Sequence, residues 1–503
     1  MIRNNTIYES TRDRNIKSSP SKALLEGLSS DGGLFVIRDI QNLSVDMDKL
    51  TNKNYFEIAQ EILKIFLDFT DEEINECVYN AYENKFSSPK ITPLVKLKDG
   101  YILELFNGPT SAFKDLGLLM LPQLISKALD KTGIKEDILI LTATSGDTGK
   151  AALEGFRDVP RTKILVFYPY GKVSKVQEMQ MLTQEGANLD VVAIHGNFDD
   201  AQSGVKNLFR NEEFREILKR ENLQLSSANS INIGRLVAQV VYYFAGYMQL
   251  IENKEIATGQ KVNFVVPTGN FGNILAGYYA KILGLPIGKL ICASNNNNVL
   301  HDFISTGIYD RRREFLKTIS PSMDILISSN LERLLYYVSD CDNFYVNKLM
   351  SDLKEEGFYR VEDNILAKIK ENFLSGYASD QETREIIKEI YENDNYLLDT
   401  HTAVAYKVLL DLLEKNPEKL GNYKNIVLST ASPYKFSKDV FEAFGEEKKI
   451  EDEFLIMEKL HEKTKVAIPE NLKNLDQKKK LHNSVIPKEE MKDYVIEALK
   501  GLK

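Results

Sequence analysis

The sequence predicts an α/β protein built on parallel sheets with helices on both faces, preceded by a mostly helical N-terminal unit. Between about residues 100 and 300, short apolar runs alternate with amphipathic stretches, as they do when helices join parallel strands. A late apolar run at 425–429 predicts one further strand. Residues 1 to about 90 carry helical spacing instead, at 55–67 and 71–86.

Each element follows from its own pattern. Residues 31–36 predict a turn that enters a short strand, and Asp71 is a suitable helix cap. The apolar stretch 237–251 is interrupted by polar residues and is too short to span a bilayer, so we expect a buried helix. We expect 309–395 to be helix-rich and the tail with Lys478–Lys480 to be a solvated helical face. The six early strands are expected at 101–105, 138–141, 163–167, 189–194, 262–266 and 289–293.

The bulk composition narrows the class of protein. A chain of 503 residues predicts two to four domains, and 43% hydrophobic residues suffice for sizeable cores. The net charge of −9 and the lack of a basic stripe argue against nucleic acid as a partner. The first residues form no apolar signal core, and the three cysteines lie far apart without metal spacing. We therefore expect a cytoplasmic protein with no membrane partner and no bound metal.

The segment 105–120, LFNGPTSAFKDLGLLM, is the most informative part of the chain. A rigid Gly-Pro turn leads into a pair of hydroxyl residues, and Lys114 follows in an otherwise apolar setting. An acid and an apolar helix come next. A surface lysine needs no such frame, whereas a lysine that must stay deprotonated to attack a carbonyl does.

The segment 141–152, LTATSGDTGKAA, places hydroxyls and glycines between a strand and the head of a helix. Free amide hydrogens and the helix dipole make such a loop an anion site. A nucleotide-binding P-loop would need glycine where Thr144 stands and a hydroxyl where Ala151 stands, so we reject it. The ordinary alternative is a capped helix with incidental hydroxyls.

Two further loops complete the pattern. In 265–277, Gly269 and Gly272 allow close approach to a ligand, and a helix that starts near Asn273 offers amide donors to a phosphate. The late strand ends in Ser-Thr-Ala-Ser-Pro at 429–433, where open sheets bind ligands. Taken alone, these loops could be an ordinary turn and a polar strand end. Together, a buried lysine, two anion loops and a strand-end hydroxyl are what an amino-acid enzyme using pyridoxal phosphate needs.

The chain resembles the threonine synthase family, in its long form with an extra N-terminal domain, within the fold-type II (tryptophan-synthase-β-like) pyridoxal-phosphate enzymes. The resemblance implies an N-terminal domain at 1–92, a smaller α/β domain at 93–235 and a larger α/β domain with helical insertions at 236–503. The matching motifs are YESTR at 8–12, GLSSDGGLF at 27–35, ELFNGPT at 104–110, AFKD at 112–115, TSGDTG at 144–149, PTGNFGN at 267–273 and SPSMDI at 320–325.

The same resemblance implies roles for individual residues. Lys114 is the catalytic residue and forms the Schiff base with the pyridoxal 5′-phosphate cofactor, Thr430 bonds the pyridine nitrogen, and Asp147 lies on the O3′ side. The cofactor phosphate is held by Gly269, Asn270, Phe271, Gly272 and Asn273. The substrate carboxylate is bound by Thr144, Ser145, Gly146 and Thr148, and the substrate phosphate by Ser230, Asn232 and Arg235.

The implied reaction converts O-phospho-L-homoserine and water into L-threonine and phosphate, by γ-elimination and β-addition of water, as the last step of threonine biosynthesis. The alternatives are a related fold-type II phospholyase, a serine or threonine dehydratase, and a non-catalytic homologue that binds the cofactor. The family resembled suggests a monomer, with a dimer left open.

Some positions depart from the family pattern. Asn107 and Ser432 stand where the family usually has histidine, and Asn298 where it usually has aspartate. The first two lie close to predicted site positions, so they bear on active-site hydrogen bonds. His401 lies in a family-like stretch, and because no partner for it can be named from the sequence, we expect a structural role.

Overall fold

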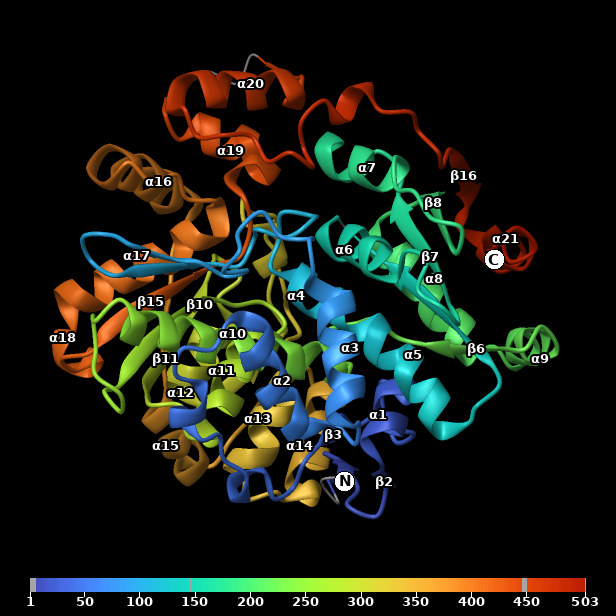
Figure 1. The fold of residues 1–503 in the computed structure, drawn as a ribbon, viewed down its shortest axis with the longest axis horizontal. Coiled ribbons are helices and arrows are strands. Elements are labelled where there is room, and N and C mark those ends of the chain that lie inside the picture. Colours follow the sequence, from blue (N-terminus) through green and yellow to red (C-terminus); the bar gives the residue numbers. More distant parts are fainter. Residues whose placement is uncertain (1–5, 145, 446–449, 503) are drawn as a thin grey trace.

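The computed structural model describes residues 6–144, 146–445 and 450–502 (Figure 1). A six-stranded sheet forms the larger half, in the order β14-β11-β10-β15-β5-β4. Neighbouring strands are parallel except for the antiparallel pair β4 and β5 at one edge. Its strands are β4 (Leu94–Lys96), β5 (Tyr101–Glu104), β10 (Val262–Pro267), β11 (Ile287–Ser294), β14 (Phe373–Tyr377) and β15 (Lys424–Ser429).

A five-stranded sheet forms the smaller half, in the order β16-β8-β7-β6-β9, and all of its neighbouring pairs are parallel. All seven runs predicted as strands are strands in the two sheets, because each carries enough apolar side chains to be buried in a sheet core. The strands of the smaller sheet are β6 (Asp137–Ala143), β7 (Thr162–Pro169), β8 (Leu189–His195), β9 (Leu223–Ser226) and β16 (Ser484–Pro487).

Strand membership departs from the expected domain ranges at both ends of the smaller unit. β4 and β5 precede the smaller sheet in sequence but belong to the larger one. The C-terminal tail, red in Figure 1, leaves α20 (Glu453–Thr464), passes the smaller sheet and adds β16 to its edge beside β8. Lys478–Lys480 in this tail are exposed, as expected, but they are not helical. The domain ranges 1–92, 93–235 and 236–503 stay a prediction.

The N-terminal unit contains a small antiparallel sheet and three helices. Thr70, rather than Asp71, caps α3, and its side chain and that of Glu73 form a reciprocal capping box. The Tyr82 hydroxyl at the end of α3 donates to the Leu116 carbonyl at 2.7 Å, so this unit contacts the helix that carries Lys114. The elements are β1 (Tyr8–Ser10), β2 (Lys17–Ser18), β3 (Phe35–Val36), α1 (Pro20–Glu26), α2 (Tyr55–Phe66) and α3 (Asp71–Tyr82).

The predicted buried helix is α10 (Ile233–Glu252), which is buried over nearly its whole length beside α2, α4 and α11. Within the described ranges no helix, α10 included, is long and apolar enough to cross a membrane. The 309–395 stretch is helix-rich, as expected, with β14 and a small antiparallel pair, β12 (Ile308–Asp310) and β13 (Phe358–Arg360), added to it.

The helices surround the two sheets, and the short α4 lies between them (Figure 1). The carboxyl ends of β6, β10 and β15 lead into the three loops singled out above. The remaining helices are α4 (Lys114–Leu118), α5 (Met120–Thr132), α6 (Asp147–Phe156), α7 (Lys175–Leu182), α8 (Phe198–Arg210), α9 (Glu212–Arg220), α11 (Gly272–Ile282), α12 (Val299–Thr306), α13 (Leu331–Val338), α14 (Asn343–Glu355), α15 (Asp363–Asn372), α16 (Asp380–Asp394), α17 (Thr400–Lys415), α18 (Pro417–Leu420), α19 (Ser437–Glu442) and α21 (Met491–Ala498).

Candidate active site

A tight turn fixes the position of Lys114, the first residue of α4. The buried Asp115 carboxylate accepts from the Thr110 amide at 2.8 Å and from the Thr110 hydroxyl at 2.5 Å, and so closes the turn. A Cβ at Gly108 would lie 2.4 Å from the Asp115 carboxylate, so glycine is required there. Ser111 adopts a left-handed φ of 58°. The Gly-Pro-hydroxyl motif therefore forms a rigid turn that fixes the position of Lys114.

The lysine segment is joined to the end of β15, which is distant in sequence. The Phe113 amide donates to the Thr430 carbonyl at 2.8 Å, and the Ser432 amide donates to the Ser111 carbonyl at 3.0 Å. Lys435, just beyond, donates to the Thr110 carbonyl at 2.9 Å. Lys114 and Thr430, predicted separately to serve one site, thus lie on adjoining backbone segments.

The Lys114 amino group lies in a nearly dry environment, with its side chain 14% exposed. Its Nζ is 3.4 Å from the Ser322 hydroxyl and 3.9 Å from the Asp147 carboxylate. Burial lowers the pKa of Lys114 to about 8; Asp147 opposes this shift, while Lys435 and Arg235 add to it. About a tenth of this amine is therefore neutral at pH 7, far more than for a lysine of ordinary pKa, and the neutral form is the nucleophile.

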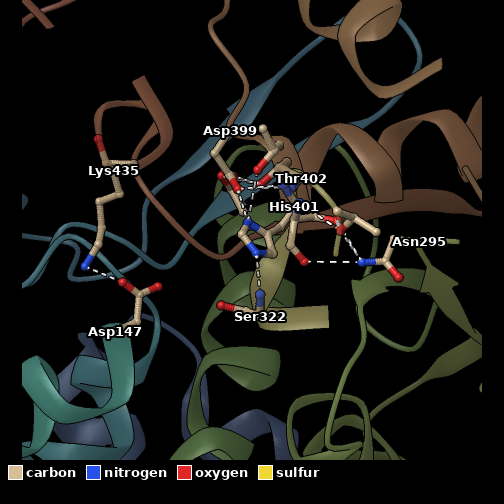
Figure 2. Close-up of polar contacts among 12 residues, drawn as sticks. Asp147, Asn295, Ser322, Asp399, His401, Thr402 and Lys435 are labelled. Carbon is tan, nitrogen blue, oxygen red and sulfur yellow. Dashed lines mark hydrogen bonds and ion pairs between the residues drawn. The ribbon is translucent and has the colours of Figure 1, made fainter. Parts of the chain in front are cut away.

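Asp147, the first residue of α6, is the acid at the centre of this group. One of its oxygens accepts from the fully buried Lys435 at 2.7 Å (Figure 2). The same oxygen accepts from Gln177 at 2.9 Å. Burial acts to raise the pKa of Asp147, but the two lysines and these hydrogen bonds hold it well below its usual range. Asp147 is thus a fixed negative charge beside Lys114. The place of Lys435 in this site is not predictable from the sequence, because nothing in Tyr434–Phe436 distinguishes it from a surface lysine.

The loop between β6 and α6 is shaped by Thr144. Its hydroxyl accepts from the amides of Gly146 and Gly149, each at 2.9 Å, and its own amide donates to the Phe167 carbonyl at 3.0 Å. A Cβ at Gly146 would meet the Gln177 side chain at 2.4 Å, and the φ of Gly146 is +149°. Ser145 lies outside the described residues, and Thr148 is half-buried. Thr144 therefore acts first on the loop's own backbone.

The loop between β10 and α11 has the features of a phosphate cradle. Phe271 adopts a left-handed φ of 60° as α11 begins, and no side chain of the described residues caps this helix. The Asn273 side-chain oxygen accepts from Tyr242 at 2.6 Å and from Tyr243 at 3.0 Å, and its buried amide nitrogen has no partner among the described residues. An unpaired buried donor at a helix N-terminus fits an anion such as the cofactor phosphate.

Gly269 shows how tightly this loop is enclosed. A Cβ there would lie 2.5 Å from the Ser322 carbonyl oxygen, so any larger residue would displace the segment that also contacts Lys114. Gly269 and Asn270 are also bonded to residues 328–330. The Ser328 hydroxyl donates to the Gly269 carbonyl at 2.7 Å, and the Asn330 side chain donates to the Asn270 carbonyl at 3.0 Å.

Arg235 is a buried cation near the lysine. It is 5% exposed, its guanidinium donates to the Ala228 carbonyl at 2.9 Å, and its Nε has no partner. No carboxylate of the described residues pairs with it. Burial lowers the pKa of Arg235 to about 10, which still leaves it charged. An unpaired buried guanidinium is costly unless an anion binds it, so this residue fits a substrate anion.

The two neighbours predicted with Arg235 differ from it. Asn232 is fully buried, and its side chain donates to the carbonyls of Leu24 and Ser227 and accepts from the Gly234 amide. It caps α10, and both of its amide hydrogens are bonded within the protein, so its side chain positions this helix; its expected contact with the substrate phosphate stays a prediction. Ser230 is half-buried.

The positions that depart from the family pattern have clear partners. The Ser432 hydroxyl accepts from the Tyr434 amide at 3.3 Å and so caps the turn that carries Lys435. The Asn107 side chain donates to Glu104 at 3.2 Å and accepts from the Ser87 hydroxyl at 3.1 Å. The Asn298 side chain accepts from Arg313 at 3.0 Å. Of the three, Ser432 is the one that bears on the charges of the site.

Three family models match the chain in succession: threonine synthase N terminus at residues 7–82, pyridoxal-phosphate dependent enzyme at 87–430, and threonine synthase, C-terminal, at 402–495. With two parallel sheets and a buried lysine between them, the chain is a fold-type II pyridoxal-phosphate enzyme. Threonine synthase from Saccharomyces cerevisiae is 38% identical over 471 residues, which span 87% of this chain and 89% of the yeast protein. The chain belongs to the threonine synthase family.

Solved structures agree with this assignment. The crystal structure of PLP-bound threonine synthase from Brucella melitensis matches with a TM-score of 0.87 and 36% identity, over 98% of this chain and 99% of that one. The structure of the yeast threonine synthase matches to the same extent. The predicted fold class, cofactor and enzyme class are therefore confirmed.

Proposed function

We propose that this protein converts O-phospho-L-homoserine and water into L-threonine and phosphate, with the residue roles derived below. The main support for a phosphorylated substrate is Arg235, a buried guanidinium without a carboxylate partner in the described chain. The Asn273 loop offers a separate anion site. Two distinct anion sites near one lysine suit an enzyme whose cofactor and substrate both carry phosphate.

The geometry supports the roles that we propose for the cofactor residues. We assign the cofactor phosphate to Gly269–Asn273, the pyridine nitrogen to Thr430 and the covalent link to Lys114. When bound, pyridoxal phosphate supplies an electron sink for the bonds at Cα of an attached amino acid. The Lys114 amine would form the covalent link to the cofactor aldehyde, with loss of one water, and its lowered pKa increases the nucleophilic fraction of this amine.

Lys114 has a second task once the substrate amine has displaced it. Its neutral amine accepts the Cα proton and returns protons as the reaction proceeds, while Asp147 stabilises the ammonium form at 3.9 Å. The loop of Gly146 and Thr148 binds the substrate carboxylate through amides at the start of α6, and Ser145 is assigned there with them. Arg235, with Ser230 beside it, holds the phosphate that leaves.

The test is to add O-phospho-L-homoserine to the purified protein and to measure threonine and phosphate together. Equal amounts of the two products support the proposal. Phosphate with 2-oxobutyrate and no threonine would identify the phospholyase alternative, and turnover of serine or threonine would identify a dehydratase. We further propose a cytoplasmic monomer, which gel filtration with light scattering would distinguish from a dimer.

A further inference from the structure

The side chain of His401 contacts Asp399 and Ser322 (Figure 2), and the sequence alone does not reveal these partners. It lies in the first turn of α17 and is 2% exposed. Its Nδ1 lies 3.0 Å from the carboxylate of Asp399, the residue that caps this helix. Its Nε2 lies 3.1 Å from the main-chain amide of Ser322.

These two contacts define the state of the ring. A main-chain amide donates, so Nε2 must accept and carries no proton. The proton then resides on Nδ1 and is donated to Asp399, whose other oxygen accepts from the Thr402 hydroxyl. His401 is therefore a neutral imidazole in a single tautomer, oriented by a buried acid.

Ser322 is the link between His401 and the catalytic lysine. Its amide is held by His401, and its hydroxyl accepts from the Lys114 Nζ at 3.4 Å. The base of the same segment is held separately, because Asn295 donates to the Ser320 hydroxyl at 3.0 Å and to Asp324 at 2.8 Å. His401 thus holds Ser322, the residue of this segment that contacts Lys114.

We propose that His401 is a positioning residue for Lys114: it holds Ser322 through its amide so that the serine hydroxyl orients the lysine amine whenever that amine is free. The proposal rests on the proposed role of Lys114 as the residue that links to the cofactor. A free amine must meet the aldehyde along one direction, and a hydroxyl acceptor on one side of Nζ turns the nitrogen toward the other.

The experiment measures how fast cofactor-free protein forms its covalent link when pyridoxal phosphate is added, by absorbance and by borohydride trapping on Lys114. H401N places an amide near Nδ1 but has no acceptor near Nε2, and we expect the link to form about tenfold more slowly. H401Q reaches the Nε2 position with its side-chain oxygen and should recover most of the rate. H301Q, at a half-buried histidine beside Ser375, is the matched control and should leave the rate unchanged.

A second measurement separates positioning from general damage. Pyridoxine 5′-phosphate has the phosphate but no aldehyde, so its affinity for H401N should equal that for the wild type. S322A should slow the link as H401N does, and the double variant should be no slower than either, because both changes break one connection. If H401N does not fold, S322A and H401Q carry the same test.

The inference is overturned if H401N forms the link at the wild-type rate, if the two substitutions slow it independently, or if pyridoxine 5′-phosphate binding falls by the same factor as the rate. A wild-type protein that forms no borohydride-trapped link at Lys114 would instead refute the proposed function, so the two failures are distinguishable.

Discussion

The fully buried Lys435 ammonium lies 2.7 Å from the Asp147 carboxylate, and the other oxygen of Asp147 faces Lys114 at 3.9 Å. One acid is therefore shared by two lysines. Lys435 is the nearer partner, and its positive charge also disfavours a proton on Lys114. Lys435 thus helps to lower the pKa of the catalytic amine, against the effect of Asp147, without contact between the two lysines.

Substitution K435M should raise the pKa of Lys114 above its value of about 8, because Asp147 would then have Lys114 as its remaining lysine partner. We expect the pH midpoint for formation of the cofactor link to move up by about one pH unit. The measurement is the rate of link formation against pH in cofactor-free protein. K438M, at an exposed lysine three residues on, is the control.

The same variant should also lose stability, since breaking a buried ion pair costs about 3–5 kcal/mol when a charge is left unpaired. Here Lys114 remains close to Asp147, so we expect the free energy of unfolding to fall by about 3 kcal/mol or less. Urea denaturation measures it. A K435M protein with an unchanged pH midpoint would contradict the role of Lys435.

Lys114 itself should leave a signature in the stability of the cofactor-free protein. Its pKa is about 8 in the fold against 10.5 ordinarily, so the unfolded chain binds more protons between these values. The free energy of unfolding therefore rises with pH across this window, by about 1.4 kcal/mol for each pH unit. The measurement is the difference in unfolding free energy between wild type and K114M at several pH values.

That difference isolates one group, because K114M keeps every other titrating side chain. The wild type should gain on K114M as the pH rises from about 8 to 10.5, and the gap should be constant below this window. A gap that does not vary with pH would mean that Lys114 keeps its ordinary pKa in the fold.

Asn273 should contribute to cofactor affinity through its unpaired amide nitrogen. A hydrogen bond to a charged phosphate contributes about 1.5–3 kcal/mol, so N273A should weaken binding by about 10- to 100-fold. Equilibrium dialysis with pyridoxine 5′-phosphate measures this without the covalent link. N253A, at an exposed position just after α10, is the control, and equal affinities in the two variants would remove Asn273 from the phosphate site.

The sequence sufficed for the strands whose own residues form apolar runs and for the loops that follow them. It did not reveal β14 and β16, whose short sequences FLSGY and SVIP pair at the edges of sheets built by other segments. For the same reason it did not reveal the contact of Lys435 with Asp147 or that of His401 with Ser322. Each of these contacts joins segments far apart in the chain, and neither partner shows a local signal of the other.

Asn232 shows the opposite limit. It stands in a stretch that resembles the substrate-binding segment of the family, yet its side chain is used to cap α10 and to bond the Leu24 carbonyl in α1. A motif identifies which segment approaches the substrate. Which side chain within it faces the ligand depends on helix geometry, and we propose Arg235, whose Nε has no partner among the described residues.

We expect the buried charge of Arg235 to lower the stability of the substrate-free protein and to strengthen the binding of substrate. A buried guanidinium without a carboxylate partner is costly, so R235M, which keeps much of the volume, should leave the substrate-free protein as stable as the wild type or more so. The visible absorbance of the bound cofactor should persist, because the Asn273 loop is untouched. The Michaelis constant for O-phospho-L-homoserine should rise strongly, since the charge that binds its phosphate is lost.

Inorganic phosphate makes this test independent of turnover. In cofactor-loaded wild type the Asn273 loop is already filled, so added phosphate should bind at Arg235 and raise the melting temperature, as a ligand of the native state does. In R235M this increase should disappear while the starting melting temperature does not fall. An undiminished increase of the melting temperature in R235M would mean that the added phosphate binds elsewhere. The assignment of the substrate phosphate to Arg235 would then be wrong.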